Sequence, residues 1–114
     1  MAYPRATREQ ILNVKDIQET EIDVPAWKMS VLVRSISALE RARIIKQSTD
    51  KDGNLDTAKF QSMIIIAGCV DPKFEKADLD ALSEKTAGAI SKLAEEIVLA
   101  SGFSMNEEEA EKNS

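Results

Sequence analysis

One loop of the chain has the composition of a calcium site. It is rich in carboxylates, contains a glycine and lies between two apolar stretches, as EF-hand loops do: Asp50-Lys51-Asp52-Gly53-Asn54-Leu55-Asp56. An EF-hand loop carries glycine at its sixth position and a bidentate glutamate at its twelfth. If the loop starts at Asp50, Leu55 occupies the sixth position; if Gly53 is sixth, Lys59 occupies the twelfth. Neither register supplies the ligands, so we interpret the loop as a polar turn, with weak incidental cation binding as the alternative.

The remaining reactive groups do not form a catalytic set. The chain contains no histidine, which removes the commonest general base and nearly every catalytic zinc site. Its single cysteine, Cys69, lies in an apolar run and is predicted to be a buried, inert thiol. Adjacent carboxylates occur at Glu95-Glu96 and Glu107-Glu108-Glu109, where a solvated surface explains them better than acid–base chemistry. The sequence therefore predicts no catalytic residue, no metal ligand and no cofactor, and a protein that is not an enzyme.

Length and charge limit the function classes further. A chain of 114 residues with 43% hydrophobic content can build one modest core without disulfides or metal. Its net charge of -5 argues against binding nucleic acid, which depends on neutralising phosphates with lysine and arginine. No stretch approaches the ~20 apolar residues of a membrane span, and the first ten residues are too polar for a signal peptide. We expect a cytoplasmic protein whose partners are other proteins, with no nucleic acid and no membrane among them.

The N-terminal part of the chain predicts a short β-hairpin behind a flexible arm. Residues 1–10 are polar and are expected to form that arm. Alternating apolar and acidic residues predict a strand over Thr20–Val24, and a β-branched run predicts a second strand over Ser30–Ile36. The segment Pro25–Met29 is then the turn between them. An isolated hairpin is only marginally stable, so this one is expected to pack against helices.

Helices are predicted for most of the remaining chain. Ser37 and Glu40 have the spacing of a capping box, and Asp56 or Thr57 can cap the next helix. The predicted helices cover residues 37–47, about 56–70, 75–83 and 86–101, the last with Thr86 as its N-cap. The Glu-rich residues 105–114 are expected to form a disordered acidic tail. We therefore predict a mainly α fold, a small helical domain over residues 11–104 with about four helices and a short N-terminal β-hairpin.

Seven side chains are candidates for binding a partner. Basic residues gather on the first predicted helix, where they can attract acidic stretches of another protein or simply pair with nearby glutamates. The second helix has an apolar stripe that is wider than a single-sided core needs. The lone tryptophan lies beside a predicted turn, where it either closes the core or anchors a partner. The candidates are Arg41, Arg43 and Lys46 on the first helix, Met63, Ile65 and Ile66 on the second, and Trp27 at the turn.

Several short motifs occur in an order that resembles a known family. They are Val24-Pro25-Ala26-Trp27, Val31-Leu32-Val33-Arg34, Ser37-Ala38-Leu39-Glu40-Arg41, Gly68-Cys69-Val70-Asp71-Pro72-Lys73-Phe74, Leu82-Ser83-Glu84-Lys85 with Ala89, and Ala100-Ser101-Gly102-Phe103. Together they resemble the tail assembly chaperones of long-tailed phages and prophages of Gram-positive bacteria, over about residues 22–103. Lys28 departs from the pattern, because many members of that family carry a glycine after the tryptophan.

This resemblance implies a non-enzymatic function. Proteins of the family coat the long, aggregation-prone tape measure protein, keep it soluble, and help recruit tail tube subunits around it during tail morphogenesis. The implied partners are therefore the tape measure protein and the tail tube protein, with self-association as a further option, in the cytoplasm of the host cell. Two alternatives stay open: another small phage structural protein of the head–tail adaptor type, and a regulatory protein-binding module.

Overall fold

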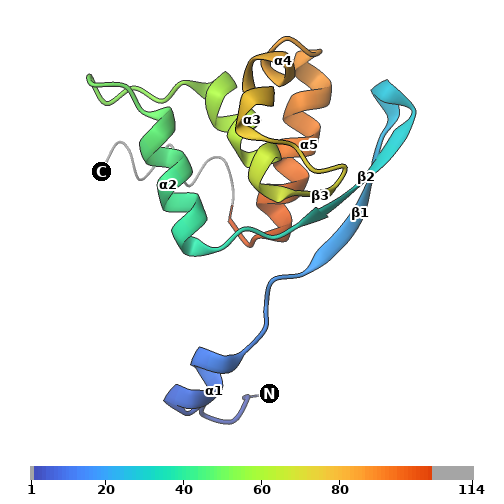
Figure 1. Cartoon of the computed structure of the whole chain (residues 1–114). Coiled ribbons are helices and arrows are strands. Elements are labelled where there is room, and N and C mark those ends of the chain that lie inside the picture. The colour runs from blue at the N-terminus through green and yellow to red at the C-terminus, as the bar shows by residue number, and fades with distance from the viewer. Residues whose placement is uncertain (1, 104–114) are drawn as a thin grey trace.

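The computed structural model describes residues 2–103, and the tail expected at residues 105–114 lies outside them. Figure 1 shows the order of its helices and strands along the chain. In the text, η denotes a short 3-10 helix. Their bounds are α1 Arg8–Asn13, β1 Glu19–Val24, η1 Pro25–Trp27, β2 Met29–Arg34, α2 Ala38–Ser48, α3 Thr57–Gly68, β3 Cys69–Asp71, η2 Lys76–Asp78, α4 Leu79–Ser83 and α5 Ala87–Ala100.

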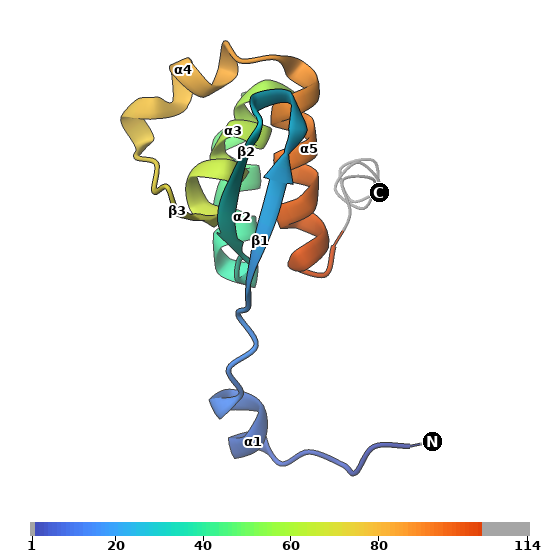
Figure 2. The same ribbon diagram turned by 90° about the vertical axis from the view of Figure 1, so that its right-hand side faces the viewer.

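A twisted antiparallel sheet in the order β1-β2-β3 lies along one side of the body (Figures 1 and 2). The hairpin expected from the sequence is present, and β1 pairs with β2 along its whole length. Alternation along the strands buries Val24, Val31 and Val33 on the inner face. The turn η1 joins the two strands, and Lys28 closes it in the left-handed conformation with a φ of 54°.

The core lies between this inner face and two helices, α3 and α5. These helices pack against each other, and α5 also contacts β1 and β2. Phe60 and Ile64 of α3 and Leu93 and Ile97 of α5 have no exposed surface at all. Two hydrogen bonds between hydroxyl or amide side chains fix the neighbouring helices to α3: Ser62 to Ser83 of α4 and Gln61 to Ser91 of α5.

Local capping signals set two of the predicted helix starts. The Ser37 hydroxyl accepts the backbone N–H of Glu40 at 3.2 Å, and the Glu40 carboxylate accepts the N–H of Ser37 at 2.9 Å. The Asp56 carboxylate accepts the N–H of Lys59 at 3.1 Å in front of α3. Both starts predicted from these caps are confirmed. Thr86 precedes α5, but its side chain makes no capping hydrogen bond.

The expected mainly α fold with about four helices is wrong. Within residues 2–103 the chain forms five α-helices and a three-stranded antiparallel sheet, which is a mixed α/β architecture. The third strand, β3, occupies residues that were expected to end a helix, because it pairs with the distant β2 through Asp71 opposite Leu32 and Cys69 opposite Val33. The additional helix, α1, starts from a capping box of Thr7 and Gln10.

Residues 2–18 stand clear of the body, and we call them the N-terminal arm; it extends beyond the ten residues expected from the sequence. Figures 1 and 2 show α1 beyond the lower end of the body, joined to β1 by an extended segment. All residues from 2 to 21 are exposed. The arm leaves the body at Gln18, whose N–H donates to the Ser35 hydroxyl at 3.0 Å and whose carbonyl accepts the Ser35 N–H at 2.9 Å. These two bonds extend the β1-β2 ladder and direct the arm outward.

Candidate partner-binding groove

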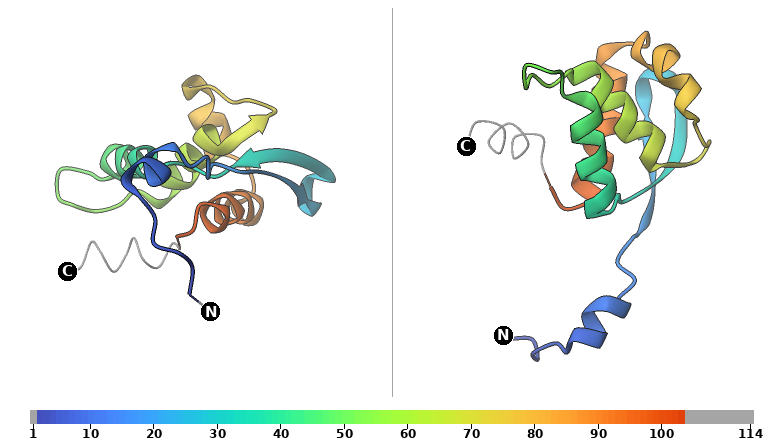
Figure 3. Two further views of the ribbon diagram at one scale, coloured as in Figure 1. Left: turned by 90° about the horizontal axis from the view of Figure 1, so that it is seen from below. Right: turned by 60° about the vertical axis from the view of Figure 1, so that its left-hand side comes forward.

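An apolar groove lies between α2, α3 and the segment formed by η2 and α4. Figure 3 shows α2 beside α3, and α3 contacts α2, η2 and α4. The groove has a volume of about 470 Å³ and is lined by Ile44, Gln47, Lys59, Met63, Ile66, Ala67, Lys76 and Leu79. This volume lies within the ~300–1,000 Å³ typical of binding pockets. It is therefore a place where the body can accept side chains of another molecule.

The floor of the groove is one face of α3. Met63, Ile66 and Ala67 have helical i, i+3, i+4 spacing and are all half-buried, so they pack against the core and still line the groove. Ile44 of α2 and Leu79 at the start of α4 form the two apolar walls. Burial of apolar surface is the main favourable term in most protein associations. This face of α3 can therefore contribute to binding without first unfolding any part of the body.

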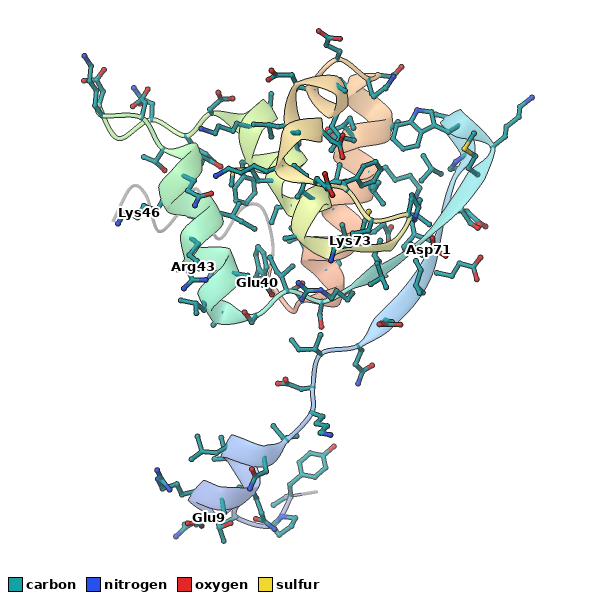
Figure 4. All side chains as sticks on the ribbon, in the orientation of Figure 1. Glu9, Glu40, Arg43, Lys46, Asp71 and Lys73 are labelled. Carbon is teal, nitrogen blue, oxygen red and sulfur yellow. The ribbon has the colours of Figure 1, made fainter. Side chains whose placement is uncertain are left out.

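The rim of the groove is cationic although the chain is acidic overall. Lys59 at the start of α3 and Lys76 in η2 both line it. Arg43 and Lys46 are exposed on α2, where Figure 4 labels them, and neither lines the groove. The structure therefore separates these two predicted residues from the apolar floor. Lysines that the sequence did not single out take their place at the rim.

Ile65 was expected among the partner contacts, and the structure corrects this expectation. Its side chain is 0% exposed and belongs to the core, because it lies about 100° around the helix from Ile66 and about 200° from Met63. Met63 and Ile66, the other two predicted contacts on α3, do line the groove. The broad apolar stripe of α3 is thus divided between two surfaces.

Arg41 and Trp27 have structural contacts within the chain. The Arg41 guanidinium lies over the Phe103 ring, 4.8 Å from its centroid, and this cation–π contact holds the end of the described chain against α2. Trp27 is half-buried in η1 and packs against the core. Neither residue lines the groove between α2 and α4.

An ion pair fixes the first turn of α2. Arg34 of β2 donates to both carboxylate oxygens of Glu40, with a distance of 3.0 Å from Nη1 to Oε1. The hydrogen bonds from Arg34 lower the pKa of the Glu40 carboxyl to about 2, and the capping bonds with Ser37 act in the same direction. The pair therefore holds the end of β2 against the start of α2, which is one wall of the groove.

The groups considered for catalysis and metal binding have other roles in the structure. The Asp50 carboxylate accepts the N–H groups of Asp52 and Asn54 at 2.9 and 2.8 Å, so it closes the turn between α2 and α3. Burial raises the pKa of the Cys69 thiol to about 11. Within residues 2–103 no three His, Cys, Asp or Glu side chains are grouped so that they could hold a metal ion.

Six of the eight residues that line the groove were not among the predicted partner contacts: Ile44, Gln47, Lys59, Ala67, Lys76 and Leu79. Lys59 lies four residues before Met63, so helical spacing places both on one face of α3 and could have identified it. Helical spacing on α2 could have identified Ile44 in the same way. Lys76 and Leu79 reach the groove only because η2 and α4 fold back over α3, which no local pattern indicates.

Comparison with known proteins gives no further assignment. No family model, curated protein or solved structure matches the chain. Among the described residues, no helix combines the length and the apolar character that crossing a membrane requires.

Proposed function

We propose that this protein is a phage tail assembly chaperone that binds a helical segment of the tape measure protein in the groove between α2, α3 and α4. In this function it keeps the tape measure protein soluble and helps recruit tail tube subunits. The observation that carries the proposal is the groove itself, with an apolar floor and a cationic rim on a chain of net charge -5. The sequence resemblance described above supplies the identity of the partner.

The dimensions of the groove favour the side chains of one helix face as its occupant. An α-helix with its side chains is ~10–12 Å across, so a whole helix cannot enter a space of about 470 Å³. A helix lying across the mouth can insert two or three large apolar side chains at i, i+3 or i+4, and i+7 spacing. A long helical protein with apolar stripes offers such segments repeatedly. Several copies of a small protein could then cover it.

The charges favour partner segments with acidic flanks. Lys59 and Lys76 lie at the rim, where they remain partly solvated and attract carboxylates next to the inserted side chains. Such rim charges mainly raise the rate of association and orient the partner, while the apolar floor supplies most of the affinity. Arg43 and Lys46, which are exposed on α2 outside the groove, extend the positive charge along this helix and can steer the same partner from farther away.

The conformation of Lys28 supports the resemblance on physical grounds. Its φ of 54° and ψ of 41° lie in the left-handed region, which glycine adopts more readily than any other residue. Glycine is also what many members of the tail assembly chaperone family carry at this position. Lys28 therefore holds, in this chain, a backbone conformation that a glycine would adopt more readily.

The proposal requires a tape measure protein encoded near this chain, and co-expression with that protein tests it. We expect the wild-type chain to keep that protein in the soluble fraction and Met63→Glu to lose this effect, because a charge on the floor must be desolvated when a helix docks. Met29→Glu is the matched control, since Met29 is 68% exposed at the hairpin and lies outside the groove.

Three outcomes of this experiment are informative. Loss of activity in Met63→Glu counts only if the variant still melts cooperatively, which circular dichroism checks. An equal effect of Met29→Glu would place the binding surface elsewhere. If the tape measure protein is equally insoluble with and without the wild-type chain, the chaperone assignment fails.

A further inference from the structure

The N-terminal arm carries most of the exposed large apolar side chains of the described chain. Eight such side chains occur in residues 2–103, and five of them lie in the arm: Tyr3, Ile11, Leu12, Val14 and Ile17. Scattered single apolar residues are normal on a surface, but a contiguous set marks an interaction site. Together these five expose on the order of 600 Å², which approaches the ~800 Å² per partner of a standard protein interface.

The helix α1 has local signals for folding but no tertiary support. Its capping box joins Thr7 and Gln10 through two hydrogen bonds of 2.9 and 3.2 Å. All its residues are exposed, and isolated helices shorter than ~12–15 residues are only marginally stable in water. A six-residue helix with Ile11 and Leu12 unburied gains stability chiefly by docking on another surface.

The arm is directed away from its own body. The reciprocal hydrogen bonds between Gln18 and Ser35 continue the β1-β2 ladder to the point where the arm departs, so the chain leaves along the strand direction. Figures 1 and 2 show the result, with α1 separated from every helix of the body. A surface for this helix is therefore more readily supplied by another molecule.

A second apolar surface lies at the root of the arm, where α2 begins and α5 ends. The Ile36 N–H donates to the Ser101 hydroxyl at 2.8 Å and joins these two helix ends. A hollow of about 250 Å³ between them has a mainly polar lining, formed by Asp16, Ile17, Ser35, Ile36, Ser37, Ala38, Ala100 and Ser101. The apolar part of the surface is formed by exposed side chains at the two helix ends: Ala38, Leu39, Leu99 and Ala100. Of these, Leu39 and Leu99 are 59% and 57% exposed. We call this surface, from Ala38–Leu39 to Leu99–Ala100, the base.

We infer that the arm is a dimerisation segment, whose apolar side chains dock on the base of a second copy of this chain while the partner's arm docks in return. Arm and base adjoin in each chain, so a twofold axis near the root lets each copy give one arm and receive one. Such an isologous exchange closes at two copies. It buries Leu39 and Leu99 together with the arm residues, which are seven of the eight exposed large apolar side chains.

Charge separates this surface from the groove. In residues 2–18 the cations Arg5, Arg8 and Lys15 outnumber the anions Glu9 and Asp16. The rim of the groove is also cationic through Lys59 and Lys76, so it offers the cations of the arm no opposite charge. The dimer therefore leaves the groove open. The inference is independent of the proposed function, because dimer mass and tape measure solubility are separate measurements.

Sedimentation of the full chain tests the inference. At about 100 µM, where a micromolar dimer is largely formed, we expect twice the chain mass of 12.6 kDa. The double variant Ile11→Glu/Leu12→Glu places two charges on the docking face and should weaken dimerisation on the order of 100-fold or more. Ala2→Glu/Ala6→Glu adds the same charge to the same arm without removing a large apolar side chain, and should remain dimeric. Both pairs are exposed, so the fold should be retained.

Disulfide trapping tests which surface receives the arm. A chain with Leu12→Cys mixed with a tagged chain with Leu39→Cys should form a mixed disulfide under mild oxidation. The matched partner is Met29→Cys, which is equally accessible at the hairpin and should not form one. The native Cys69 is buried and does not compete. A monomeric wild-type chain, a dimer that survives Ile11→Glu/Leu12→Glu, or equal trapping by Met29→Cys would each overturn the inference.

Discussion

The two faces of α3 use the same residue types for different purposes. On one face Phe60, Ile64 and Ile65 are 0% exposed and belong to the core, where α3 packs against α5. On the other face Met63 and Ile66 are only half-buried and line the groove. Ile65 and Ile66 are adjacent and chemically identical, yet a rotation of about 100° around the helix gives one to the fold and the other to the surface. Apolar character alone therefore does not tell stability from binding.

The largest expected effect is on the buried face. Ile65→Ala should lower the free energy of unfolding by about 2–5 kcal/mol, because it leaves a cavity in a fully packed core. Ile66→Ala is the matched control and should cost only about 1 kcal/mol, since its side chain is already in contact with solvent. Urea denaturation of both variants measures the difference. Equal losses would mean that the groove face is part of the core.

A smaller loss is expected at the end of α3, where Gly68 lies against Ile97 of α5. A Cβ atom at Gly68 would lie 2.6 Å from Cγ2 of the fully buried Ile97, so Gly68→Ala should destabilise the protein by about 1–3 kcal/mol through overpacking. Gly88→Ala is the control, because nothing lies within 4 Å of its Cβ position in α5. That change should raise stability by up to about 1 kcal/mol through helix propensity. A neutral Gly68→Ala would show that α3 and α5 can separate.

The parts of the fold that local chemistry specifies could be predicted from the sequence. Ser37 with Glu40, and Asp56, start α2 and α3 where the capping rules place them. The hairpin also followed from alternation and turn composition. In contrast, β3 is three residues long and exists because Cys69–Asp71 meets β2, which lies far away in sequence. Its apolar residues continue the pattern of α3, so periodicity extended the helix through them.

The candidate site could be predicted only where it lies on one helix. Met63 and Ile66 were identified because the stripe on α3 is too broad for one face, but periodicity could not say which isoleucine turns inward. The walls from α2 and α4 depend on tertiary packing. The helix α1 had a readable signal in Thr7 and Gln10, and the polar composition of the first ten residues hid it.

On α2 a charged side chain, that of Glu40, is fixed by its contacts in the same way as the apolar side chains on the core face of α3. The Glu40 carboxyl is held by Arg34 and Ser37, and its pKa is lowered from 4.5 to about 2. Because the folded state favours the ionised form, the pair contributes stability above about pH 4.5 and loses it as the pH falls toward 2. Glu40→Gln should cost about 1 kcal/mol at pH 7, since the side chain is 31% exposed and solvent screens the pair.

The glutamine in this variant can still complete the capping box, so the measurement isolates the charge. The difference in unfolding free energy between wild type and Glu40→Gln should shrink as the pH is lowered from 5 to about 2.5. Thermal melts at several pH values measure it. A difference that stays constant over this range would show that the ion pair with Arg34 contributes nothing to stability.

The smallest effect on stability is expected at the rim of the groove, and there it should be separated from the effect on binding. Lys59 is partly exposed at the start of α3, so Lys59→Glu should change the unfolding free energy by no more than about 0.5 kcal/mol. The same change reverses a charge beside the groove and should weaken binding of an acidic, apolar-striped tape measure peptide several-fold, mostly through slower association. Lys51→Glu makes the same charge change in the exposed turn before α3, outside the groove, and should leave binding nearly unaltered.

Because rim charges are screened by salt, the difference between the two variants should fall as ionic strength rises. Stopped-flow association of a labelled peptide at low and high salt measures this. If Lys59→Glu and Lys51→Glu slow association equally, the peptide responds to the net charge of the chain and the groove face of α3 is not its binding site.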